Sequence, residues 1–151
     1  MSTKNVINIL MADDDPDDRH FFERALKKTA LSTRLTTVED GEQLIEYLLK
    51  KQKNPDILFL DINMPRKNGY ECLLEIKGNK DLAGFPVIMY STSLKDAMAD
   101  MLFHAGAHHY LCKCDLPDLI KYLTLILTML KDNNLTRPLK DQFVLNGTRG
   151  A

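Results

Sequence analysis

The sequence lacks a segment suited to crossing a membrane or directing export. No apolar run approaches the roughly 20 residues that a membrane-spanning helix needs. The N-terminal residues Met-Ser-Thr-Lys-Asn contain no apolar signal core. We therefore expect a cytoplasmic protein with no membrane partner.

An excess of basic residues is also missing. The formal net charge is −1, whereas domains that bind nucleic acid usually carry a clear surplus of Lys and Arg. We therefore expect no nucleic-acid partner.

Cysteine is scarce, with three residues at Cys72, Cys112 and Cys114. An odd number of cysteines argues against a disulfide framework. Cys112 and Cys114 lie close in sequence to His108 and His109, but no second Cys/His pair at zinc spacing completes a metal site. We prefer to interpret these cysteines as reduced thiols in and beside a buried strand.

What the chain does contain is a regular alternation of strand-length apolar runs and helical patterns. With 151 residues, 44% of them hydrophobic, it suits one domain with a buried core. The patterns predict strands at 6–12, 35–38, 57–60, 87–90 and 110–112, and helices at 16–29, 44–49, 70–77, 95–104 and 117–130. Because the strands are mostly apolar, we expect an α/β fold in which helices cover both faces of a parallel sheet.

The segment 132–151 differs from the rest of the chain. It is polar, carries Pro138 and two glycines, and lacks helical periodicity. We expect a domain at 1–131 and a flexible C-terminal tail at 132–151. Residues 143–145, Phe-Val-Leu, are apolar enough to dock on the domain, but we favour a mobile end.

Polar residues follow four of the predicted strands at their carboxyl ends. In open parallel α/β sheets, ligands bind at this edge. The residues are Asp13 and Asp14 after the first strand, Asp61 after the third, Ser91 and Thr92 after the fourth, and Lys113 after the fifth. Clustered carboxylates repel one another, and a divalent cation such as Mg²⁺ removes that repulsion. A lysine and a hydroxyl could bind phosphoryl oxygens, and a carboxylate can act as the nucleophile in phosphoryl transfer.

Each of these residues has a simpler explanation when it is taken alone. Aspartates at a helix start commonly act as caps and dipole partners, which accounts well for Asp15, Asp17 and Asp18. Lys113 alone would be a surface lysine, and Ser91 with Thr92 would be a helix cap. The joint pattern, with each residue type at the appropriate strand end, favours a site.

Four motifs resemble those of response-regulator receiver domains, and the resemblance covers about residues 6–130. They are ILMADDDP at 9–16, LFLDINMP at 58–65 followed by Gly69, PVIMYS at 86–91, and GA at 106–107 with YLCK at 110–113. The resemblance implies a flavodoxin-like, doubly wound (βα)5 fold, with a five-stranded parallel sheet in the order 2-1-3-4-5.

The resemblance also implies roles for individual residues. Asp61 would be the phosphoacceptor, Asp14 would bind Mg²⁺ directly, Asp13 would act on the ion mainly through water, and Asn63 would offer its backbone carbonyl to the metal. Of the remaining site residues, Ser91 and Lys113 would contact phosphoryl oxygens, Thr92 with Asn63 would influence water access, and Tyr110 would be the switch aromatic.

The function implied is that of a phosphoacceptor signalling switch in a two-component system, a regulator that catalyses its own phosphorylation and slow dephosphorylation rather than a true enzyme. The donor would be a sensor histidine kinase, a phytochrome-like kinase, a phosphotransfer protein or a small acyl phosphate. The segment 132–151 is too short for a DNA-binding output domain. We therefore expect output through protein contacts.

One departure from the family concerns the residue after the lysine, which is Cys114 where the family usually has a proline in a cis peptide. A cis bond before a non-proline residue costs roughly 2.5–4 kcal/mol. Either the bond is trans and the loop differs, or the site stores strain.

The last predicted helix has apolar residues on two sides. One stripe should face the sheet, whereas Tyr122, Leu125 and Met129 lie roughly opposite it. They are either tolerated surface residues or tail-covered residues, or they form a partner or homodimer face. Sedimentation of Leu125→Glu beside the wild type distinguishes these possibilities.

Three other functions are open to the same sequence. A degenerate receiver would act as a phosphorylation-independent interaction module, but the intact carboxylates and lysine argue against it. A magnesium-dependent aspartyl phosphatase would use Asp13 with Asp15, yet such enzymes usually have a longer chain with a cap. A helical phosphotransfer protein with His20 as acceptor conflicts with the strand pattern.

Overall fold

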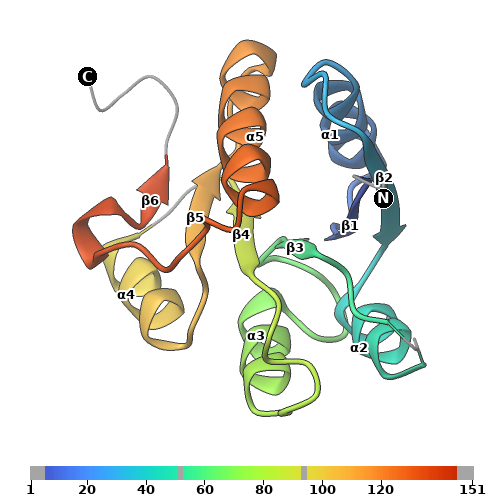
Figure 1. Ribbon diagram of the computed structural model, residues 1–151. Coiled ribbons are helices and arrows are strands. Elements are labelled where there is room, and N and C mark those ends of the chain that lie inside the picture. Colours follow the sequence, from blue (N-terminus) through green and yellow to red (C-terminus); the bar gives the residue numbers. More distant parts are fainter. Residues whose placement is uncertain (1–5, 51–52, 93–94, 146–151) are drawn as a thin grey trace.

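The computed structural model describes residues 6–50, 53–92 and 95–145. Five strands alternate with five helices, as the sequence predicts, and a short 3-10 turn and a sixth strand follow them (Figure 1). In chain order the elements are β1 (Ile7–Ala12), α1 (Pro16–Lys27), β2 (Thr33–Val38), α2 (Gly41–Lys50), β3 (Ile57–Leu60), α3 (Gly69–Lys77), β4 (Val87–Ser91), α4 (Asp96–His104), β5 (His109–Cys112), α5 (Leu116–Lys131), η1 (Lys140–Gln142) and β6 (Val144–Leu145).

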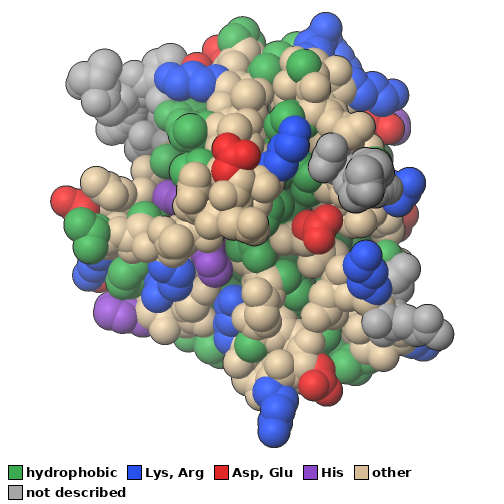
Figure 2. Space-filling view, viewed as in Figure 1, with side chains coloured by type: hydrophobic (Ala, Val, Ile, Leu, Met, Phe, Trp, Pro, Cys, Tyr) green, Lys and Arg blue, Asp and Glu red, His purple; other side chains and the backbone are tan. Residues whose placement is uncertain are grey.

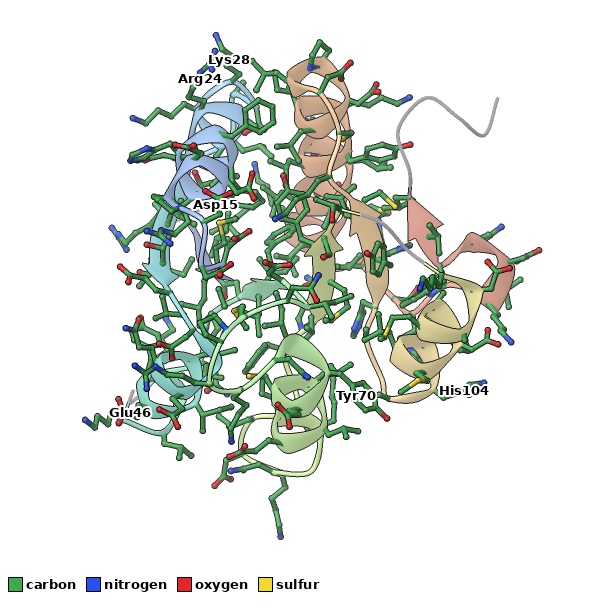
Figure 3. All side chains as sticks on the ribbon, turned by 180° about the vertical axis from the view of Figure 1, so that it is seen from behind. Asp15, Arg24, Lys28, Glu46, Tyr70 and His104 are labelled. Carbon is green, nitrogen blue, oxygen red and sulfur yellow. The ribbon has the colours of Figure 1, made fainter. Side chains whose placement is uncertain are left out.

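Local sequence signals determine where the helices next to the strand ends begin. Asp15, labelled in Figure 3, accepts a hydrogen bond from the N–H of Asp17 and caps α1, which starts at Pro16. Asn68 and Glu71 form a capping box at the start of α3. These caps end the loops that follow β1 and β3, so they help to fix the backbone at the carboxyl edge of the sheet.

The sheet has six parallel strands in the order β2-β1-β3-β4-β5-β6. The predicted order of the first five strands is therefore confirmed, but the prediction of a five-stranded sheet is wrong. The additional strand is β6, which pairs with β5 through Tyr110 opposite Val144 and Leu111 opposite Leu145. A two-residue strand has too little periodicity to be recognised in a sequence.

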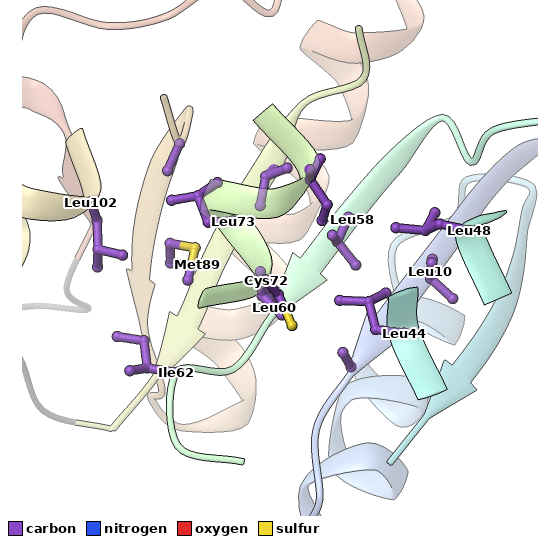
Figure 4. Packing of buried hydrophobic residues seen from close by; sticks show 14 of the residues in the cluster. Leu10, Leu44, Leu48, Leu58, Leu60, Ile62, Cys72, Leu73, Met89 and Leu102 are labelled. Atoms are coloured by element: carbon purple, nitrogen blue, oxygen red, sulfur yellow. The ribbon is translucent and has the colours of Figure 1, made fainter. Parts of the chain in front are cut away.

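Helices cover both faces of the sheet, and each face has its own apolar layer. On one side, α1 and α5 pack against the strands with Phe22, Leu26 and Leu123 among the buried residues. On the other side lie α2, α3 and α4, as the labelled side chains of Figure 4 illustrate with Leu44 and Leu73. All residues of β3 are buried, which explains why this strand is apolar throughout.

The segment before β6 is held by specific contacts. Phe143 is 1% exposed, and its ring packs edge-on against Phe103 of α4 with the centroids 5.4 Å apart. Its carbonyl oxygen accepts the N–H of Tyr110 at 3.0 Å and lies 3.1 Å from Nδ1 of His109. Residues 132–145 thus include well-packed side chains, while the division of the chain at residue 131 stays a prediction.

The surface carries charges of both signs. On the face shown in Figure 2, basic and acidic side chains are interspersed among apolar ones. None of the described helices has the length and apolar character needed to pass through a bilayer.

We expect Phe143→Ala to lower the free energy of unfolding by about 3 kcal/mol, because the truncation leaves a cavity between α4 and β5. Urea unfolding followed by circular dichroism measures the change. Leu139→Ala is the matched control, since Leu139 is 71% exposed and its truncation should cost less than about 0.5 kcal/mol. Equal stability of the two variants would contradict the docking of Phe143.

Candidate functional site

Three aspartates meet at the carboxyl edge of the sheet because β1 and β3 are neighbours. Ala12 pairs with Leu60 in the sheet, and the N–H of Asp61 donates to the carbonyl of Ala12 at 3.0 Å. This register places Asp61 beside Asp13 and Asp14. Each of the three offers a carboxylate oxygen, and these oxygens lie within 4.8 Å of one another. The structure therefore brings together the three carboxylates that the sequence singled out.

Asp61 is held from several directions and is only 5% exposed. The hydroxyl of Ser91 donates to its Oδ1 at 3.0 Å, and the N–H of Asn63 makes a longer contact with the same oxygen at 3.4 Å. Its Oδ2 lies 3.9 Å from Nζ of Lys113. One carboxylate oxygen thus accepts the described hydrogen bonds, while the other has a lysine near it without a hydrogen bond.

Burial makes the charge of this cluster costly. Burial raises the pKa of Asp61 to about 6; Lys113 opposes this shift, and the neighbouring Asp13 adds to it. Burial also raises the pKa of Asp13, although the N–H of Asp15 and the amine of Lys113 both stabilise its charged form. A divalent cation with oxygen ligands would stabilise the charged forms of these two neighbouring carboxylates, so the pair is suited to binding one.

The more exposed site residues lie around the buried pair. Asp14, Asn63 and Thr92 are exposed, so their side chains are open to solvent and to a ligand. Among the described residues, Asp13, Asp14 and Asp61 form a potential metal-binding group, and the stretch with Cys112 and Cys114 forms none.

Lys113 reaches the site, but its nearest partners differ from those expected. Its Nζ donates to Oδ2 of Asp13 at 2.9 Å and to Oδ2 of Asp18 at 2.8 Å. Sequence reasoning missed Asp18, which it assigned to the start of a helix. The signal available was its position four residues after Asp14, one turn into α1. Every peptide bond in the described residues is trans, so of the two alternatives for Lys113–Cys114 the trans bond is the one found.

Gly69 has a positional role that the sequence did not reveal. A Cβ built at this residue would lie 2.2 Å from the carbonyl oxygen of Asp61 and 2.8 Å from Cα of Ile62. The N–H of Gly69 donates to the carbonyl of Ile62 at 2.8 Å. Only glycine allows α3 to start this close to the strand end that carries Asp61.

Tyr110 lies on β5 behind Ser91. Its side chain is fully buried and hydrogen-bonds Ser91, and burial raises its pKa to about 12. A continuous set of contacts therefore joins Asp61 to Ser91 and Ser91 to Tyr110.

The remaining candidate residues lie away from this edge. Leu125 is 48% exposed, whereas Tyr122 and Met129 are half-buried on the same helix. Tyr122 also packs against the apolar layer of α1 and α5. His20 is exposed on α1. The proposed partner face on α5 stays a prediction.

Comparison with protein families gives one match over most of the chain. The model of the response regulator receiver domain matches residues 9–124. The matched segment contains all the residues described above at the carboxyl edge of the sheet.

Two curated relatives have similar sequences. The response regulator Rcp1 of Synechocystis sp. is 32% identical over 121 residues, which cover 75% of this chain and 81% of that protein. The two-component response regulator ORR8 of Oryza sativa subsp. indica is 30% identical over 120 residues, which cover 77% of this chain and 97% of that protein.

Solved structures give the same fold. The crystal structure of the Mn(2+)-bound form of Rcp1 superposes with a TM-score of 0.75 at 28% identity, covering 87% of this chain and 99% of that one. The phosphorylated cyanobacterial phytochrome response regulator RcpA superposes with a TM-score of 0.76 at 26% identity, covering 84% of this chain and 95% of that one.

The raised pKa of Asp61 predicts how its replacement changes stability with pH. The folded state binds the proton of Asp61 up to about pH 6, whereas the ordinary pKa is 3.8, so ionisation between these values destabilises the fold. In EDTA at neutral pH, Asp61→Asn should therefore raise the free energy of unfolding by about 1–3 kcal/mol. The gain should shrink as the pH falls below about 6 and vanish near pH 4.

Chemical denaturation at several pH values measures this difference. Asp17→Asn, which removes an exposed carboxylate from α1, should change stability by less than about 0.5 kcal/mol at each pH. A stability gain of Asp61→Asn that is the same at pH 4 and pH 7 would contradict the assigned pKa.

Proposed function

Because the chain belongs to the response-regulator receiver family, we propose that it is a phosphoacceptor switch of a two-component system, with Asp61 as the residue that is phosphorylated. The observation that carries the proposal is the meeting of Asp61 with Asp13, Asp14 and Lys113 at one sheet edge. A nucleophilic carboxylate, a place for a cation and an amine for the phosphoryl oxygens are the components that this transfer requires.

Magnesium is the cofactor that we propose for this edge. Asp61 and Asp14 would bind the ion directly, Asp13 would act mainly through water, and Asn63 would contribute its backbone carbonyl. The oxygen-only donor set and the raised pKa of Asp61 support this assignment. The Mn(2+)-bound structure of Rcp1 agrees with it. When bound, the ion neutralises negative charge on the carboxylates and on the phosphoryl group.

In the proposed transfer, Asp61 attacks phosphorus with Oδ2, because its Oδ1 accepts the hydroxyl of Ser91. A P–O bond to Asp61 forms while the bond between phosphorus and the donor breaks, and the donor atom keeps the electron pair. A phosphohistidine donor then regains a proton on its ring, and an acyl phosphate leaves as a carboxylate. With a pKa of about 6, Asp61 is ionised at neutral pH and needs no general base.

The other site residues would act on the phosphoryl group or respond to it. Lys113 and Ser91 would donate to phosphoryl oxygens, and the exposed Thr92 and Asn63 would influence how water reaches the acyl phosphate. If Ser91 moves toward a phosphoryl oxygen, its contact with the buried Tyr110 changes. The change would then pass from the site to β5.

The proposed donor is a sensor histidine kinase, a phytochrome-like kinase or a phosphotransfer protein in the cytoplasm. RcpA, whose structure is similar to that of this chain, is described as a phytochrome response regulator. This similarity favours a phytochrome-like kinase as the donor. The downstream partner would be a protein that contacts the face of α5 around Leu125, or a second copy of this chain.

Two alternatives fit the geometry less well. A phosphatase that used Asp13 as nucleophile would need a carboxylate oxygen free to attack, yet both oxygens of Asp13 accept hydrogen bonds, one from the N–H of Asp15 and one from Lys113. A degenerate receiver would not need the three carboxylates to converge.

Incubation with acetyl phosphate and Mg²⁺ tests the proposal. We expect a mass increase of about 80 Da that maps to Asp61, and its loss with EDTA or in Asp61→Asn. Asp17→Asn should be phosphorylated like the wild type, because Asp17 is exposed on α1. A modification that persists in Asp61→Asn, or none in the wild type, would refute the proposal.

A further inference from the structure

The amine of Lys113 is held by two carboxylates, and neither belongs to Asp61. Its distances are 2.8 Å to Asp18 and 2.9 Å to Asp13, against 3.9 Å to Asp61. An ammonium group has three donors, and two of them are directed at Asp13 and Asp18. Lys113 is therefore drawn toward α1 and lies outside hydrogen-bonding distance of Asp61.

The ion pairs with Asp13 and Asp18, rather than close packing, keep the amine of Lys113 where it lies. An open pocket of about 360 Å³ adjoins the lysine and is lined by Asp17, Asp18, Phe21, Tyr90, Lys113 and Cys114. Nζ of Lys113 also lies 5.3 Å from the centroid of the Tyr90 ring. Of the two carboxylates that hold the amine, only Asp18 lies outside the group formed by Asp13, Asp14 and Asp61. Its charge is therefore the one whose removal weakens this hold without changing that group.

We propose that Asp18 is a positioning residue that restrains Lys113 away from Asp61 and so slows phosphorylation of this chain. The inference rests on the proposed function, because it assumes that Asp61 accepts the phosphoryl group. To bring its amine to a phosphoryl oxygen on Asp61, Lys113 must lengthen its contact with Asp18. Asp13 also holds the amine, but its carboxylate belongs to the group of three aspartates at the site. We therefore assign the role of restraining Lys113 away from Asp61 to Asp18 alone.

Asp17 provides a matched comparison within the same turn of α1. It carries the same charge, and its described hydrogen bond runs from its backbone N–H to the side chain of Asp15. The carboxylate of Asp18, by contrast, accepts a hydrogen bond directly from the amine of Lys113. Replacing either aspartate by asparagine removes one negative charge from this end of the helix, but only Asp18→Asn weakens the hold on Lys113.

Phosphorylation rates of Asp18→Asn, Asp18→Glu, Asp17→Asn and wild type test the inference. The probe is acetyl phosphate with Mg²⁺, and the fraction of protein with the added phosphoryl group is followed by intact mass. Asp18→Asn should be phosphorylated about three- to tenfold faster than wild type, because Lys113 can then pair with the phosphoryl group. Asp18→Glu restores a carboxylate and should bring the rate back toward wild type.

An effect that arises from the direct contact of Asp18 with Lys113 should persist at high salt, whereas an effect of charge at long range should be screened. In about 1 M salt the Debye length falls to about 3 Å, and the gain of Asp18→Asn should remain. Asp17→Asn should stay within about twofold of wild type.

The inference would be overturned by an Asp18→Asn rate no higher than that of Asp17→Asn, by an Asp18→Glu rate equal to that of Asp18→Asn, or by loss of the gain in salt. In each of these cases Asp61 is still phosphorylated, so the proposed function stands. Absence of phosphorylation in the wild type would overturn both.

Discussion

The repulsion between the carboxylates of Asp13 and Asp61 is the interaction on which the rest of the site depends. Both side chains are almost excluded from water, and the pairing of β1 with β3 keeps them at neighbouring strand ends. They cannot separate without breaking the sheet, so the folded state must neutralise them. It does so with Lys113, with a proton on Asp61 when the pKa of about 6 permits it, and, in our proposal, with a divalent cation.

The same sheet that creates this repulsion connects it with distant parts of the chain. Asp61 contacts Ser91 at the end of β4, Ser91 contacts Tyr110 on β5, and the N–H of Tyr110 donates to Phe143 beside β6. Phe143 in turn packs against Phe103 of α4. The C-terminal segment is therefore three contacts from Asp61, although it lies far away in the sequence.

The sequence was sufficient to predict features that repeat or that follow from parallel strands. Uniformly apolar runs predicted the alternation of strands and helices, and the common edge of parallel strands brought Asp13, Asp14 and Asp61 together. Features that depend on a single tertiary contact were missed. The role of Asp18 depends on the direction of the Lys113 side chain, and the role of Gly69 depends on the close approach of α3 to Asp61. The formation of β6 depends on the packing of Phe143.

If Asp13, Asp14 and Asp61 act on one Mg²⁺ ion, as we propose, the ion must perturb all three residues at once. Titration of ¹⁵N-labelled protein with Mg²⁺, followed by NMR, measures this. We expect the amide signals of Asp13, Asp14 and Asp61 to shift together along one saturable curve. Signals that do not shift, or shifts that fall elsewhere on the molecule and do not saturate, would contradict it.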